Sequence, residues 1–237
     1  MRNQAFPHAW DKERVDSGAT FYATQTDDEA LAELKAAFDG PAQTHGRRGS
    51  LRYDGSMAIS AATYEQVALE DSDTVWEYVC GSLREKPSMT QAHNDVAFYL
   101  AHVLASQLDR SQFRVRSNSG RVRTTEGNAY VPDVMVVPAD SSLAQKGTRK
   151  LEWFGGPVPF VAEVWSPSTG AYDIDTKLPE YRARGDGVIW RIHPYEQLVQ
   201  AWERQPDGSY SEHTHRTGAV RIPSLPHVTI ELAAIFE

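Results

Sequence analysis

The sequence has neither a long apolar run nor a second cysteine. Crossing a bilayer takes roughly 20 consecutive apolar residues, and no stretch of the 237 residues approaches that length, so we expect no membrane-spanning segment. Cys80 has no partner in the chain, which excludes an internal disulfide. Residues 1–18 carry charges where a secretion signal would be apolar, and we therefore expect a cytoplasmic protein.

Positive charge is also scarce, because 24 lysines and arginines face 32 aspartates and glutamates, giving a formal net charge of −8. This balance argues against broad electrostatic attraction to nucleic acid, although a local basic surface can coexist with an acidic total. Alternation along a strand would place Arg121 and Arg123 on one side, where they could follow a phosphate backbone. A row of solvated charges is the simpler interpretation, so the charge pattern leaves the partner open.

The composition changes along the chain and indicates two parts. Residues 1–56 are polar, with one helix signal in which Thr26 and Glu29 form a capping box before a short apolar repeat. A turn-rich stretch follows, and the sequence then becomes denser in apolar residues. We therefore expect an N-terminal helical extension with a linker over residues 1–56 and a single domain over residues 57–237.

Within the domain, apolar periodicity predicts a mixed order of helices and strands. Helices are expected over residues 59–70, 90–109 and 175–185, and a hairpin over residues 76–86 with its turn near Cys80, Gly81 and Ser82. Further strands are expected over residues 113–119, 121–126, 130–137, 160–165, 187–193, 197–204 and 209–216. This order predicts an α/β fold built around a mixed β-sheet.

Two of the expected strands carry an acid among apolar residues. Asp133 lies in YVPDVMVV and Glu163 in FVAEVW, where an unpaired buried carboxylate is costly. A divalent cation such as Mg²⁺ would compensate both, since it typically takes one or two protein carboxylates together with water and phosphate oxygens. Lys177 follows in the first turn of the next expected helix and could orient a water or a phosphate oxygen.

Simpler interpretations of the same residues exist. Asp133 could face water or an arginine on an edge strand, and Lys177 could be a solvated helix residue or pair with Asp173 or Glu180. Their occurrence together is what favours a site.

The order of these segments resembles the Uma2 family of endonucleases, also known as DUF820, in the PD-(D/E)XK nuclease superfamily. The resemblance is carried by TYEQVA, WEYVCGSL, PSMTQAHNDVAFYLAHVL, VPDVMVV, FVAEVWSPST, DIDTKLPEYRARG and VIWRIHP. It covers the chain from about residue 59 onward and leaves out most of residues 1–56. His193 departs from the family, whose members usually have an aspartate at that position.

The resemblance implies a restriction-endonuclease-like fold, with a mixed β-sheet core flanked by helices. It also implies hydrolysis of phosphodiester bonds with Mg²⁺ or Mn²⁺, nucleic acid (DNA above all) as the partner, and a homodimer. Asp133 and Glu163 match the metal-binding acids. The superfamily lysine would stand at position 165, which is Trp165 here, and Lys177 matches the lysine that Uma2 members carry on the next helix.

Two more residues match the family less specifically. Glu77 corresponds to a hairpin glutamate that would be an extra acid near the metal or a base for water, although a hairpin glutamate is commonly exposed. His93 opens the long helix, where it could ligate metal, contact phosphate or hydrogen-bond Glu163, or merely satisfy a core hydrogen bond.

The sequence thus predicts a metal-dependent endonuclease. A non-catalytic nucleic-acid-binding or regulatory module that keeps the nuclease fold is the alternative, and the presence of both acids and the lysine argues against it. A third possibility is a sugar hydrolase that uses paired carboxylates such as Glu77 and Glu163, whose activity would survive a chelator.

Overall fold

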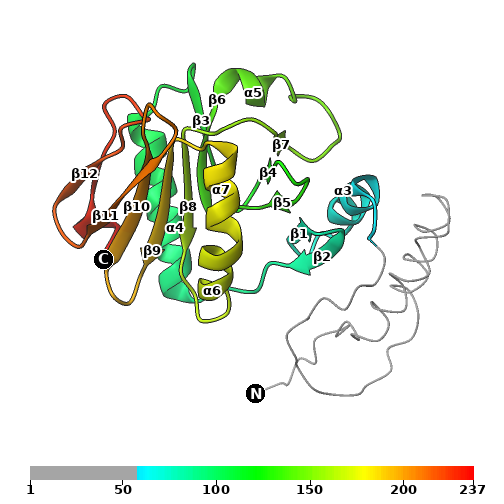
Figure 1. Cartoon of the computed structure of the whole chain (residues 1–237), viewed down its shortest axis with the longest axis horizontal. Coiled ribbons are helices and arrows are strands. Elements are labelled where there is room, and N and C mark those ends of the chain that lie inside the picture. The colour runs from blue at the N-terminus through cyan, green and yellow to red at the C-terminus, as the bar shows by residue number, and fades with distance from the viewer. Residues whose placement is uncertain (1–57) are drawn as a thin grey trace.

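The computed structural model describes residues 58–237 (Figure 1). The expected N-terminal helix, with its Thr26 and Glu29 capping pair, lies outside the described residues. The α-helices of the described part are α3 (Ala61–Glu70), α4 (Gln91–Gln107), α5 (Ala139–Leu143), α6 (Gly170–Tyr172), α7 (Leu178–Arg184) and α8 (Leu232–Phe236). None of these helices combines the length and apolar character needed to cross a membrane.

The larger sheet has six strands in the order β11-β10-β9-β8-β6-β3. Its members are β3 (Phe113–Ser117), β6 (Val134–Pro138), β8 (Phe160–Val164), β9 (Val188–His193), β10 (Leu198–Arg204) and β11 (Tyr210–His215). Strands β8 and β9 run parallel and the other neighbours run antiparallel, which confirms the predicted mixed sheet. The parallel pair requires a crossover, and the helical segment α6 to α7 supplies it.

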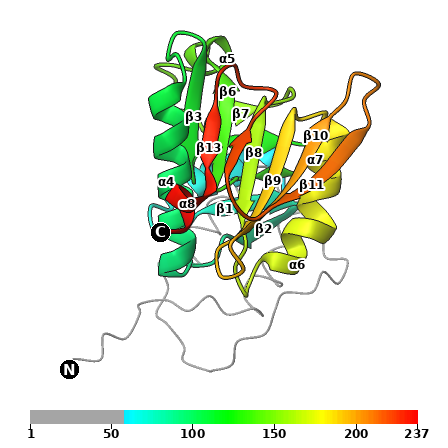
Figure 2. The ribbon, with the colours of Figure 1, turned by 90° about the vertical axis from the view of Figure 1, so that its left-hand side faces the viewer.

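Helices cover both faces of this sheet, as Figure 2 shows for α4 on one side and α7 on the other. Alternation along β6 divides its side chains between two apolar clusters. Val134 and Val136 pack in the cluster that contains Leu100 of α4, whereas Met135 packs in the cluster that contains Tyr181 of α7. All five residues of β8 are buried, as expected for a strand covered on both faces.

A smaller, five-stranded sheet has the order β2-β1-β5-β4-β7. Its members are β1 (Trp76–Val79), β2 (Ser82–Glu85), β4 (Arg121–Arg123), β5 (Ala129–Tyr130) and β7 (Trp153–Phe154); β12 (Ala219–Arg221) and β13 (Thr229–Glu231) form a separate pair. The predicted hairpin is confirmed as β1 and β2. Cys80 and Gly81 turn it with φ of 50° and 79°, the positive values that a two-residue hairpin loop requires.

The run expected as one strand over residues 130–137 is split between the two sheets. Tyr130 ends β5 in the small sheet and Val134 begins β6 in the large one. Pro132 lies at the break, where a residue without a backbone N–H interrupts no ladder. Asp133 therefore lies just before a strand and not in the middle of one, and the prediction of a continuous strand was wrong.

The crossover helix begins earlier than the sequence suggested. α6 starts at Gly170, and residues 173–177 form a π-helical turn before α7. Pro179, which has no N–H to donate, occupies the first turn of α7. Lys177 is consequently in the π-helical turn instead of the first turn of the helix. The helix ends as predicted, because Gly185 adopts a left-handed φ of 80°.

Candidate active site

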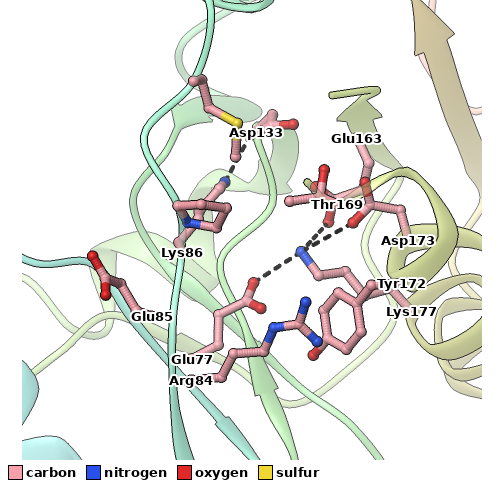
Figure 3. A pocket seen from close by; sticks show the side chains of 12 residues that line it. Glu77, Arg84, Glu85, Lys86, Asp133, Glu163, Thr169, Tyr172, Asp173 and Lys177 are labelled. Atoms are coloured by element: carbon pink, nitrogen blue, oxygen red, sulfur yellow. Dashed lines mark hydrogen bonds and ion pairs between the residues drawn. The ribbon is translucent and has the colours of Figure 1, made fainter. Parts of the chain in front are cut away.

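A pocket lies where the two sheets meet the crossover helix (Figure 3). Its charged lining consists of the acids Glu77, Glu85, Asp133, Glu163 and Asp173 and the cations Arg84, Lys86 and Lys177. The small sheet contributes Glu77 through β1, the large sheet contributes Glu163 through β8, and the π-helical turn contributes Lys177. The structure thus brings four of the five predicted site residues to one pocket.

Asp133 has three polar partners although it is only 2 % exposed. Its Oδ1 forms an ion pair with Lys86 Nζ at 2.7 Å, while its Oδ2 lies 3.0 Å from His93 Nε2 and 2.7 Å from the backbone N of Val164. Burial acts to raise the pKa of Asp133, but the positive charge of Lys86 and the hydrogen bond from His93 outweigh it and hold the pKa below its usual range.

His93, the fifth predicted residue, lies behind the pocket. Its backbone N–H donates to Thr90 Oγ1, which caps α4, and its ring is completely buried. The ring hydrogen-bonds Asp133, and not Glu163 as one of the expected roles required. In this arrangement His93 orients Asp133.

Glu163 lies in β8 beside two donors. Tyr181 donates its hydroxyl to Glu163 Oε1 at 2.5 Å, and Lys177 Nζ lies 3.1 Å from the same oxygen. Burial raises the pKa of Glu163 to about 8; Lys177 opposes this shift, while the charges of Asp133 and Asp173 add to it. This carboxyl therefore holds its proton far more strongly than Asp133 does.

Lys177 is surrounded by carboxylates and is only 3 % exposed. Its Nζ lies 2.9 Å from Glu77 Oε1, 3.1 Å from Glu163 Oε1 and 3.6 Å from Asp173 Oδ1. Burial acts to lower the pKa of Lys177, but Glu163 and the other acids raise it well above its usual value. Glu77 is buried rather than exposed on the hairpin, and its Oε1 also accepts from the backbone N of Val131.

Three residues of this site were not among the predicted site residues. Asp173 was considered as an ion-pair partner of Lys177, and its Oδ1 does lie 3.6 Å from Lys177 Nζ at i, i+4 spacing. Tyr181, four residues after Lys177, donates its hydroxyl to Glu163. Lys86 gave no signal, because a lysine that follows a hairpin strand is normally solvated, whereas its side chain here is 8 % exposed.

The arginines expected as a possible phosphate-binding row are engaged within the protein. Arg116 forms two hydrogen bonds with Glu152, at 2.6 and 2.7 Å. Arg121 donates to the hydroxyl of Tyr64, and the guanidinium of Arg123 lies 4.4 Å from the centre of the Trp153 ring. These contacts match neither interpretation of the arginines, because a row of solvated charges would not be engaged by partners within the protein.

The pocket lining fits a hard divalent cation in its donor type and its charge. Five acids and three cations line it, a formal excess of two negative charges. Within residues 58–237, no three Asp, Glu, His or Cys side chains are arranged to enclose a metal by themselves. Mg²⁺ does not require such a cage, because it usually keeps several waters and takes one or two carboxylates. Asp133 and Glu163 are the residues that would hold it.

Comparison with known proteins supports the same fold. The family model Uma2, described as "Putative restriction endonuclease", matches residues 61–234. The chain is similar in structure to a "putative nuclease belonging to DUF820" from Anabaena variabilis ATCC 29413, with 17 % identity and a TM-score of 0.60 over 72 % of this chain and 94 % of that one. That likeness confirms the predicted fold class. A search of curated proteins finds no match.

Proposed function

Since the chain belongs to the Uma2 family, we propose that it is a metal-dependent endonuclease that hydrolyses phosphodiester bonds in nucleic acid, with DNA as the expected substrate. The observation that carries the proposal is the position of Asp133, Glu163 and Lys177. These three residues come from a strand start, a strand and a helical turn, and they line one buried pocket. A protein that only binds nucleic acid has no need of such a set.

In this proposal Asp133 and Glu163 hold Mg²⁺ or Mn²⁺. The bound ion would polarise the scissile phosphate and lower the pKa of a coordinated water. Lys177 would stabilise the negative charge that develops on the phosphate oxygens, because its ammonium lies 3.1 Å from Glu163 in a site where water provides little screening. Glu77, bonded to Lys177, would fix the direction of that ammonium.

His93 and Tyr181 act through the two acids. Their contacts with Asp133 Oδ2 and Glu163 Oε1 fix the carboxylates in direction, as second partners commonly do for metal ligands. Each of these contacts uses one oxygen of its carboxylate. Lys177 and Tyr181 both contact Oε1 of Glu163.

The test is cleavage of supercoiled plasmid DNA and of labelled DNA and RNA oligonucleotides in Mg²⁺ or Mn²⁺, compared with EDTA. We expect metal-dependent cutting that Asp133→Asn and Lys177→Met abolish while Lys146→Met, at an exposed position, retains it. Cutting in EDTA would favour carboxylate chemistry instead. Mn²⁺ binding that Asp133→Asn and Glu163→Gln leave unchanged would remove the proposed metal ligands.

The proposal also includes the N-terminal residues, the oligomeric state and the location of the protein. We expect residues 1–56 to be an extension to the nuclease domain and the protein to form a homodimer in the cytoplasm. Light scattering coupled to size-exclusion chromatography, on the full chain and on a chain shortened to residues 57–237, would measure the oligomeric state of each.

A further inference from the structure

Lys86 is bound in a way that the proposed chemistry does not use. Its ammonium lies 2.7 Å from Asp133 Oδ1, 2.7 Å from Asn118 Oδ1 and 2.8 Å from the carbonyl oxygen of Val131. The contacts with Asn118 and Val131 are hydrogen bonds, and the contact with Asp133 is an ion pair. The arrangement is a positive charge held in a small cage of oxygen atoms.

One oxygen of this cage belongs to the proposed metal ligand. Asp133 Oδ2 is already shared by His93 and the backbone N of Val164, which leaves Oδ1 as the oxygen turned to a cation. Lys86 Nζ lies 2.7 Å from Oδ1. A divalent ion at that oxygen would stand next to an ammonium, and two positive charges so close repel each other strongly in a buried site.

We propose that Lys86 is a tethered cation that occupies Asp133 in the metal-free protein and has to leave Asp133 when a divalent metal binds. The inference rests on the proposed function, because it concerns how the same site acquires its metal. Lys86 differs in this respect from Lys177, which is balanced by three carboxylates and keeps two of them if Glu163 turns to a metal.

Because Lys86 has to be displaced from Asp133, the metal binds more weakly than it would if Asp133 had no ion-pair partner. Only molecules in which Asp133 is free of Lys86 can bind the metal, so the apparent affinity falls in proportion as that fraction becomes smaller. An anionic group in the pocket would favour the exchange, because the released ammonium could pair with it. Lys86 thereby couples metal binding to the arrival of a phosphate group.

The first experiment is calorimetric titration of Mn²⁺ into the full-length protein and its Lys86→Met variant, with Lys146→Met as a matched control at an exposed site. Methionine keeps the apolar stem and removes the charge. We expect Lys86→Met to bind Mn²⁺ at least about tenfold more tightly and the control to bind like the wild type. If Lys86 only supported the fold, removing it would weaken Mn²⁺ binding by releasing Asp133 from its position.

A second variant separates displacement from simple loss of charge. Asn118→Gly removes one oxygen of the cage and changes no charge, and glycine tolerates the φ of 47° found at this position. Losing one hydrogen bond loosens the ammonium, so we expect Mn²⁺ affinity to rise by about two- to tenfold. A gain in Lys86→Met without any gain in Asn118→Gly would overturn the displacement, since the missing positive charge would explain it.

The outcomes also distinguish this inference from the proposed function. Mn²⁺ binding that Asp133→Asn abolishes, but that neither Lys86→Met nor Asn118→Gly strengthens, would overturn the role of Lys86 and leave the metal site standing. No Mn²⁺ binding in any variant, even with a DNA oligonucleotide present, would overturn both. Circular dichroism tests whether each variant is folded. If Lys86→Met does not fold, the Mn²⁺ affinity of Asn118→Gly tests the displacement of Lys86.

Discussion

Asp133 and Glu163 are two buried carboxyls that line the same pocket and have opposite acidities. They are 2 % and 4 % exposed, so burial acts on both. Yet the pKa of Asp133 is held below its usual range, whereas that of Glu163 is raised to about 8. Burial alone cannot separate them, and the difference lies in their partners.

The ratio of cations to acids differs on the two sides of the pocket. Asp133 has Lys86 as its ion-pair partner and accepts further from His93 and a backbone N–H. Glu163 shares one ammonium, that of Lys177, with two other acids. The comparison teaches that a buried acid is ionised where it has a cation of its own and holds a proton where cations are shared.

The largest expected effect comes from removing Lys177, the cation that three acids share. Lys177→Met leaves Glu77, Glu163 and Asp173, the acid-rich side of the pocket, without this positive charge. Uncompensated buried charge typically costs about 3–5 kcal/mol of folding stability. Urea unfolding followed by circular dichroism at pH 7 measures the loss, with Lys146→Met as control. Protonation neutralises the acids at lower pH, so the loss should be smaller at pH 5. An equal loss at both pH values would contradict this account.

The local structure around these acids was largely predictable from the sequence. Apolar residues at helical spacing located α4, whose buried face includes His93 and Leu100. The turn at Cys80 and Gly81 fixed the hairpin that carries Glu77. Both features depend on residues close together in the chain, where spacing and turn chemistry act directly.

The pairing of charges was not predictable, because it depends on how distant segments pack. Lys86 meets Asp133 only because the hairpin of the small sheet is packed against the start of β6. Asp133 lies just before β6 because the apolar run is divided at Pro132, with its first part in the small sheet and its second part in the large sheet. Periodicity alone does not distinguish a continuous buried strand from one that changes sheets.

A smaller effect is expected from neutralising the acid that has its own cation. Asp133→Asn leaves Lys86 buried without its carboxylate, although Asn118 and Val131 still accept from it. We expect a loss of about 2–3 kcal/mol at pH 7, the range for hydrogen bonds to charged groups. The same urea titration measures it, and Asp95→Asn, at an exposed position of α4, is the control. An unchanged midpoint would show that Asp133 is not ionised in the folded protein.

Tyr181 allows the acid-rich side to be weakened without changing any charge. Tyr181→Phe removes the hydroxyl that donates to Glu163 Oε1 at 2.5 Å, and we expect a loss of about 1.5–2 kcal/mol. Tyr195→Phe is the matched control, because its hydroxyl bonds Thr90 at an exposed site. Equal losses in the two variants would mean that the contact with Glu163 contributes no more than a surface hydrogen bond.

A change in the opposite direction is expected from Glu163→Gln, which resembles the protonated carboxyl that the pKa of about 8 implies. We expect its free energy of unfolding, measured in EDTA, to equal that of the wild type near pH 4.5 and to exceed it at pH 7, because only the wild-type carboxyl releases a proton on unfolding. Asp133→Asn should be clearly less stable under the same conditions, which makes the two amide variants a direct comparison of the two acids.

The pH dependence then provides the sharper test of the same variant. The folded protein keeps the proton of Glu163 up to about pH 8, whereas the unfolded chain releases it near the ordinary value of 4.5. Because the folded state binds more protons between these values, stability falls as the pH rises through them and levels off above. Glu163→Gln should remove this part of the decline between pH 5 and 8. If the variant declined as steeply as the wild type, another group would be titrating, and the contrast between Asp133 and Glu163 would lose its basis.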